Sequence, residues 1–202
     1  MRAALRADVP RTWRYWDKGP WQGDQGNTSQ CVAYAAAHWL HAGPVTHRSL
    51  APSTVPYMNL PAFYTECQRN DEWPGEDYDG TSVRASGRVL TQLGLVDAYH
   101  WAFNLTDVID AVLSTGPVVM GTDWYTGMFE PDSMGMVEGT GIVVGGHAYL
   151  LYGVNTLSRI ATCRNSWGLD YGLSGTFRMS FDLLEELILS NGEAMLATEH
   201  AG

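Results

Sequence analysis

Cys31 stands where a polar, glycine-punctuated loop meets an alanine-rich stretch. Residues 23–30 read Gly-Asp-Gln-Gly-Asn-Thr-Ser-Gln, and residues 32–40 have an alanine-rich helical pattern. A thiol at a helix start lies beside unpaired backbone N–H groups and the positive end of the helix dipole, which stabilise the thiolate and lower the thiol pKa. Since the thiolate is the nucleophilic form, this position predicts a reactive cysteine.

Two partners that such a nucleophile needs occur downstream. His147 follows Gly145 and Gly146 at the entry to an apolar run, and Asn165 follows a second apolar run. A nucleophilic thiol requires an imidazole within hydrogen-bond reach and a third group that fixes the tautomer and orientation of that imidazole. Cys31, His147 and Asn165 therefore form a candidate catalytic set for acyl transfer.

At these residues the chain resembles the papain-like cysteine peptidases, and the resemblance covers most of its length. The matching segments are Pro10 with Trp13-Arg14, Gln25-Gly26 before Cys31, Gly146-His147-Ala148, Asn165-Ser166-Trp167-Gly168, and Gly172 with Gly175-Thr176-Phe177-Arg178. The resemblance implies that the side-chain amide of Gln25 joins the Cys31 backbone N–H in an oxyanion hole. It also implies a fold with two lobes and a cleft between them.

The resemblance further implies a set of substrate-binding residues: Gly80, Thr81, Gly145, Gly146, Ala148 and Trp167. Gly80 and Thr81 would border the cleft and pair with an extended peptide. The small residues beside the histidine would line the pocket for the side chain two positions before the scissile bond. Trp167 would cover the hydrogen bond between His147 and Asn165 and shield it from water.

The cysteines depart from the pattern of the family. Thr28 occupies the position of a disulfide cysteine, and its expected partner region, residues 79–82, also lacks cysteine. Loss of both partners fits synthesis in a reducing compartment. Of the other two cysteines, Cys163 is predicted to pack in the core beside Asn165. Whether Cys67 and Cys163 form a disulfide is left open by the sequence.

Composition narrows the classes of partner. The chain has 202 residues, a formal net charge of −10 and an isoelectric point near 4.8, which argues against nucleic acid and against an anionic membrane surface. We expect a peptide or protein substrate and no cofactor or metal. His38 and His41 share a helix face as a metal pair would, but without a third ligand they are predicted to face solvent. The oligomeric state is open.

The start of the chain suggests where the protein is made. Residues 1–8 lack the apolar core of a signal peptide, and no run reaches the roughly 18 apolar residues of a membrane span. We therefore expect synthesis in the cytoplasm, with later release or association with a virion left open. Because the segment that resembles the mature start of the family lies close to Met1, the resemblance implies a bacterial or phage type of member without a propeptide.

The predicted fold class is α+β, a papain-like two-lobe fold in one domain, residues 1–202. Residues 1–112 form the mainly helical lobe, and residues 113–202 form the β lobe, which resembles an antiparallel barrel. Helices are expected over 31–41, 83–93, 107–113 and 181–188, and strands over 118–121, 143–144, 147–154, 160–164 and 175–179, with 195–197 as an edge strand. Four prolines limit residues 44–64 to short helical turns.

The function that these observations favour is that of a thiol endopeptidase, a hydrolase that cleaves peptide bonds through a thioester acyl-enzyme. One alternative is a cell-wall peptide amidase or endopeptidase that uses the same residues. The other is a catalytically inactive protein that keeps the papain fold for binding or structure.

Overall fold

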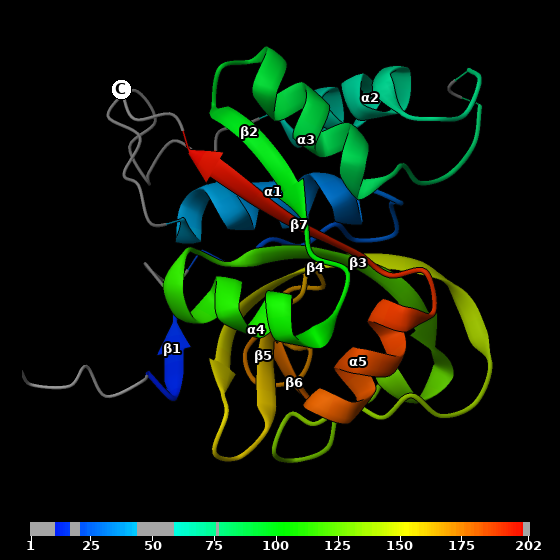
Figure 1. Ribbon diagram of the computed structural model, residues 1–202. Helices are drawn as coiled ribbons and strands as arrows, with labels where there is room; N and C mark the ends of the chain where they lie inside the picture. Colours follow the sequence, from blue (N-terminus) through cyan, green and yellow to red (C-terminus); the bar gives the residue numbers. More distant parts are fainter. Residues whose placement is uncertain (1–10, 17–20, 44–58, 76, 200–202) are drawn as a thin grey trace, which may run out of the picture.

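The computed structural model describes residues 11–16, 21–43, 59–75 and 77–199, which combine α-helices with one antiparallel sheet (Figure 1). The helices are α1 (Cys31–Ala42), α2 (Leu60–Asn70), α3 (Val83–Gln92), α4 (Leu105–Ser114) and α5 (Phe181–Leu189). The strands are β1 (Trp13–Tyr15), β2 (Val96–Trp101), β3 (Val118–Tyr125), β4 (Val143–Asn155), β5 (Ile160–Arg164), β6 (Thr176–Ser180) and β7 (Glu193–Glu199). They follow the order β2-β7-β3-β4-β5-β6, and β1 pairs with β4.

Helix α1 lies at the centre, against α2 and α3 on one side and strands β3 and β4 on the other (Figure 1). Its alanines explain why it fits there. Ala33, Ala36 and Ala37 have no exposed surface, and such small side chains let neighbouring elements approach the helix closely. Cys31 is the first residue of this helix and is therefore carried by a rigid, buried element.

Strands β4 and β5 bring the other two candidate residues together. His147 lies in β4, opposite Thr122 of β3, and Asn165 directly follows β5. Because Leu150 of β4 pairs with Arg164 of β5, the two adjacent strands place Asn165 near His147. The sheet register thus positions a histidine and an asparagine that are 18 residues apart in sequence.

Several expected elements are confirmed, and the differences have local causes. Helix α2 contradicts the expectation of short turns only, because Pro61 falls in its first turn, where a missing N–H removes no helical hydrogen bond. The Asn59 side chain caps this helix by accepting from the Ala62 backbone N–H at 3.1 Å. Strand β7 is longer than expected. It is not an edge strand, because it pairs with both β2 and β3. Strand β2 was not expected.

The architecture of mixed helices and antiparallel strands is the α+β class expected from the sequence. In the described part of the chain, every helix is too short or too polar to cross a bilayer.

Candidate active site

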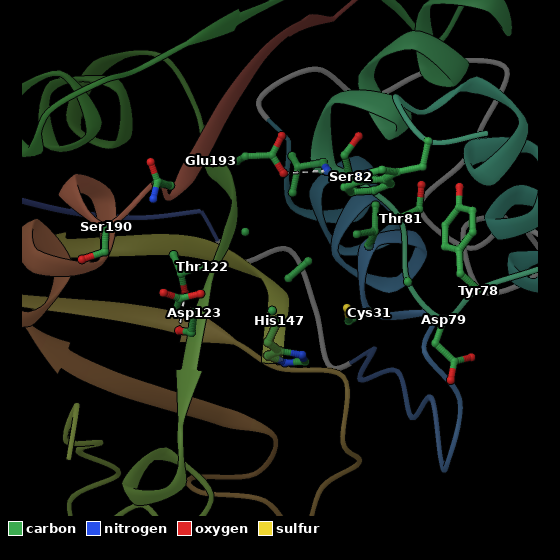
Figure 2. Close-up of a pocket in the computed structure, with 18 of the residues that line it drawn as sticks. Cys31, Tyr78, Asp79, Thr81, Ser82, Thr122, Asp123, His147, Ser190 and Glu193 are labelled. Atoms are coloured by element: carbon green, nitrogen blue, oxygen red, sulfur yellow. Dashed lines mark hydrogen bonds between the residues drawn. The ribbon is translucent and has the colours of Figure 1, made fainter. Parts of the chain in front are cut away.

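A cleft of about 660 Å³ runs between the helices and the sheet, and it contains both Cys31 and His147. One side is formed by the first residue of α1 and the segment that leads into α3, and the other by β3, β4 and the start of β7 (Figure 2). In Figure 2 the His147 ring points from β4 toward the Cys31 sulfur. The structure therefore places the predicted nucleophile and the predicted base opposite each other in one cavity.

Asn165 holds the histidine ring. Its Oδ1 lies 2.7 Å from His147 Nε2, and Asn165 is fully buried. An amide oxygen only accepts hydrogen bonds, so Nε2 carries the proton and Nδ1 is left as the basic ring nitrogen. The Asn165 backbone N–H donates to the Gly175 carbonyl at 2.9 Å, and the Gln22 side-chain amide donates to the Asn165 carbonyl. The orienting residue is thus itself fixed from both sides.

Two indole rings flank the histidine. The ring centroids of Trp124 and Trp167 each lie 4.7 Å from that of His147. Trp167 also stacks on Phe129, with a centroid distance of 5.4 Å and an interplanar angle of 6°. These rings bury the hydrogen bond between His147 and Asn165 among apolar surfaces, which strengthens it by excluding water. Trp124, in β3, was not singled out from the sequence, where it has no recognisable motif.

Burial controls the charge state of the pair. Cys31 is half-buried; burial raises the pKa of its thiol, and the backbone N–H groups of Ala148, Val32 and Cys31 itself oppose this shift without overcoming it. The expectation of a lowered thiol pKa at the helix start is therefore wrong for the free site. Burial also lowers the pKa of His147 to about 4, although the hydrogen bond with Asn165 acts in the opposite direction. Each group taken singly is neutral at pH 7.

Gln25 lies in the loop before α1 and is tied to the segment after β5. Its backbone N–H donates to the Ser166 carbonyl at 2.8 Å. Its side-chain amide donates to the Thr28 carbonyl at 2.5 Å and accepts from the Ser166 hydroxyl at 2.5 Å. Gln25 is not among the residues that line the cleft, so its role in an oxyanion hole stays a prediction.

The cleft includes four of the six predicted substrate-binding residues, namely Gly80, Thr81, Gly146 and Ala148. Gly145 lies outside the lining in β4, and Trp167 packs on the histidine ring instead. The segment at Gly80 is fixed from behind, because its backbone N–H donates to the Tyr64 hydroxyl oxygen at 2.8 Å. The Thr81 hydroxyl donates to Asp71 at 2.8 Å.

Glu193 is a further cleft residue that sequence reasoning missed. It begins β7, and its carboxylate accepts hydrogen bonds from the first turn of α3. No motif marks it in the sequence, since its partners lie 109 and 110 positions away.

Cys67, Cys163 and His38, all in the described part of the chain, lie outside the residues that line the cleft. Cys67 and Cys163 are free thiols, so no disulfide joins them. Both are fully buried, and burial raises the pKa of both thiols. His38 does not face solvent as expected: it is 2% exposed, and its Nε2 accepts from the Gly23 backbone N–H at 3.3 Å. Among the described residues no cluster of side chains is suited to hold a metal ion.

Comparison with known proteins gives a sequence relative and structural neighbours. No protein-family model matches the chain. An uncharacterized peptidase C1-like protein of Acanthamoeba polyphaga mimivirus is 23% identical over 205 residues, covering 78% of this chain and 63% of that protein. The chain thus spans less than two thirds of the length of this relative.

Solved structures show the fold. Xylellain, a cysteine protease from Xylella fastidiosa, has a TM-score of 0.75 at 17% identity, covering 95% of this chain and 87% of its own. The bromelain protease from Ananas comosus, in complex with the E64 inhibitor, has a TM-score of 0.67 at 16% identity, covering 94% of this chain and 100% of its own. The chain therefore has the fold of the papain-like cysteine proteases, as the sequence predicted.

Proposed function

We propose that this chain is a cysteine-type endopeptidase in which Cys31 is the nucleophile, His147 the general base and acid, and Asn165 the orienting residue. The observation that carries the proposal is the 2.7 Å contact between His147 Nε2 and Asn165 Oδ1, which leaves Nδ1 basic on a ring that points toward Cys31. The peptidase C1-like relative and the cysteine proteases of the same fold support it.

The reaction begins with neutral groups, because burial disfavours either charge alone. As Cys31 Sγ attacks the peptide carbonyl carbon, the thiol proton passes to His147 Nδ1, so that the two opposite charges form together and stabilise each other. The tetrahedral oxyanion is held by the Cys31 backbone N–H at the start of α1 and by the Gln25 amide, with about 3 kcal/mol per donor.

The intermediate then collapses to a thioester as the C–N bond breaks and His147 gives its proton to the leaving amine. In the second half, His147 Nδ1 takes a proton from water, and the resulting hydroxide attacks the thioester carbonyl. The C–S bond breaks, Cys31 regains its proton from His147, and the new carboxylic acid leaves. Asn165 keeps the ring in one orientation throughout.

The test is a digest of a quenched fluorescent peptide mixture, beside a digest of purified bacterial cell-wall peptides. We expect cleavage of internal bonds in the peptide mixture by the wild type, and none by Cys31→Ser. E64, which the bromelain structure contains, should label Cys31 alone, as read by mass spectrometry. Cleavage of cell-wall peptides only would replace the general endopeptidase by a narrower amidase. Absence of both activities and of E64 labelling in the folded protein would leave a binding protein.

A further inference from the structure

Glu193 connects the two sides of the cleft. It is the first residue of β7 and pairs with Gly121 of β3, on the side of the cleft that carries His147. Its carboxylate extends to the opposite side, where Oε2 accepts from the Val83 backbone N–H at 3.0 Å and Oε1 accepts from the Arg84 backbone N–H at 3.4 Å (Figure 2). The two sides are therefore joined by one side chain at this end of the cleft.

The first turn of α3 needs such a partner. Its leading backbone N–H groups have no acceptor within the helix, and α3 has no acidic residue in its first turn. The Ser82 side chain caps one of them by accepting from Ala85 at 3.1 Å. Glu193 serves the two N–H groups before it, from a strand more than 100 positions later in the chain.

The helix and strand also meet sterically at this point. A Cβ atom on Gly121 would lie 2.7 Å from Val83 Cγ2 and 3.3 Å from Glu193 Oε2. Glycine therefore allows the start of α3 to rest directly on β3. Gly80, Thr81 and Ser82, which line the cleft, immediately precede this contact in the chain.

We propose that Glu193 is a positioning residue that clamps the start of α3 to β3 and so sets where the backbone of Gly80–Ser82 meets the substrate. This inference rests on the proposed peptidase function and adds a residue to it. Glu193 touches neither Cys31 nor His147 in this scheme; it acts through the segment that the substrate lies against.

The raised pKa of Glu193 indicates that the charge on this carboxylate does not add to the stability of the fold. Burial raises the pKa of Glu193, the nearby Glu72 adds to that shift, and the Val83 and Arg84 N–H groups with the Arg84 guanidinium oppose it without overcoming it. A carboxylate whose folded pKa is raised stabilises the fold in its protonated form and loses that contribution as pH rises through the folded pKa. At pH 7 a neutral amide should therefore be tolerated at least as well as the charged group.

The experiment compares Glu193→Ala and Glu193→Gln with the wild type, and Glu185→Ala serves as control because it removes an exposed carboxylate from α5. Amide-resolved hydrogen exchange is the first measurement. The Val83 and Arg84 amides should exchange about tenfold faster in Glu193→Ala, as loss of a hydrogen bond to a charged group implies. In Glu193→Gln, Val83 should keep part of its protection and Arg84 should lose it, because an amide offers one acceptor and a donor.

The second measurement is the kinetics of peptide cleavage, alongside the melting temperature at pH 7. KM should rise roughly three- to tenfold in Glu193→Ala and less in Glu193→Gln, while kcat stays within about twofold, because the clamp affects substrate placement and not the reacting pair. The melting temperature of Glu193→Gln should equal or exceed that of the wild type, and Glu185→Ala should change none of these values.

Unchanged exchange at Val83 and Arg84 in both Glu193 variants would overturn the clamp. Faster exchange with unchanged KM would overturn its role in substrate placement, as would a fall in kcat and melting temperature together without a KM effect. If the wild type cleaves no peptide, the proposed function fails, and the clamp still stands or falls on the exchange rates.

Discussion

At the scale of single residues, the two ring nitrogens of His147 have different roles in the proposed reaction. Nε2 is committed to Asn165 at 2.7 Å, so only Nδ1 can take the thiol proton. The two indoles beside the ring bury it, which lowers its pKa to about 4 and keeps it a neutral base over most of the acidic range. The proposed chemistry therefore depends on the side chains that hold and bury this ring.

Removal of the orienting amide should affect turnover more than binding. In Asn165→Ala the ring loses the acceptor that selects its tautomer, so we expect kcat to fall roughly tenfold or more with little change in KM. Steady-state kinetics on the cleaved peptide measures this. A rise in KM at unchanged kcat would show instead that Asn165 supports the substrate side of the cleft.

The buried His147 should also make stability depend on pH. Its folded pKa lies below the unfolded value of 6.5, so on acidification the unfolded chain takes up a proton that the folded chain refuses. This contribution is complete above pH 6.5 and is lost between pH 6.5 and about 4, to a total of about 3 kcal/mol. The free energy of unfolding, measured with urea at several pH values across that range, should change less steeply with pH in His147→Gln than in the wild type. Equal slopes would contradict the buried neutral imidazole.

At the scale of elements, the glycines around the cleft serve different purposes. Gly121 lies where β3 meets α3, whereas a Cβ on Gly146 of β4 would have nothing within 4 Å. We expect Gly121→Ala to lower the free energy of unfolding by about 1–3 kcal/mol through overpacking against Val83. Gly146→Ala, the matched control, should stay within about 0.5 kcal/mol. Chemical denaturation of both variants tests this, and equal effects would deny a tight contact at Gly121.

The elements that could be predicted from the sequence are those with local signals. Helix α1 begins at the loop of glycines and ends before Gly43, and β5 is a short apolar run bounded by polar residues. Helix α2 could not be predicted, because Pro61 breaks a helix in its interior and starts one in its first turn, and only the cap at Asn59 distinguishes the two cases.

The residues of the candidate site likewise divide into those with a local sequence signal and those without one. Cys31, His147 and Asn165 carry short motifs, and the structure brings the first two into one cleft and the last two into contact. Trp124 and Glu193 act through partners that are distant in sequence, which no local pattern reveals. The direction in which the pKa of the Cys31 thiol shifts could not be predicted from the sequence either. It depends on how deeply the start of α1 is buried, and the whole fold sets that burial.

At the scale of the whole molecule, the fold places a nucleophile and a base from distant segments on opposite sides of one cleft. Helix α1 carries Cys31 and packs on β4, the strand that carries His147. Because both groups are partly or fully withdrawn from water, burial disfavours the charged form of each one alone, and we propose that the reactive state forms when the proton moves between them. We propose that this transfer activates Cys31, whereas the fully buried Cys67 and Cys163 stay inert.

The most direct test is the rate of iodoacetamide alkylation at each cysteine between pH 5 and 9, read by mass spectrometry in the wild type and in His147→Ala. We predict that at pH 6 Cys31 reacts at least about tenfold faster than the buried Cys67 and Cys163. In His147→Ala the Cys31 rate at pH 6 should fall at least about tenfold, and Cys31 should respond only as pH approaches or passes the ordinary thiol value of about 8.5. Equal rates at the three cysteines, or a Cys31 rate that does not depend on His147, would contradict the account.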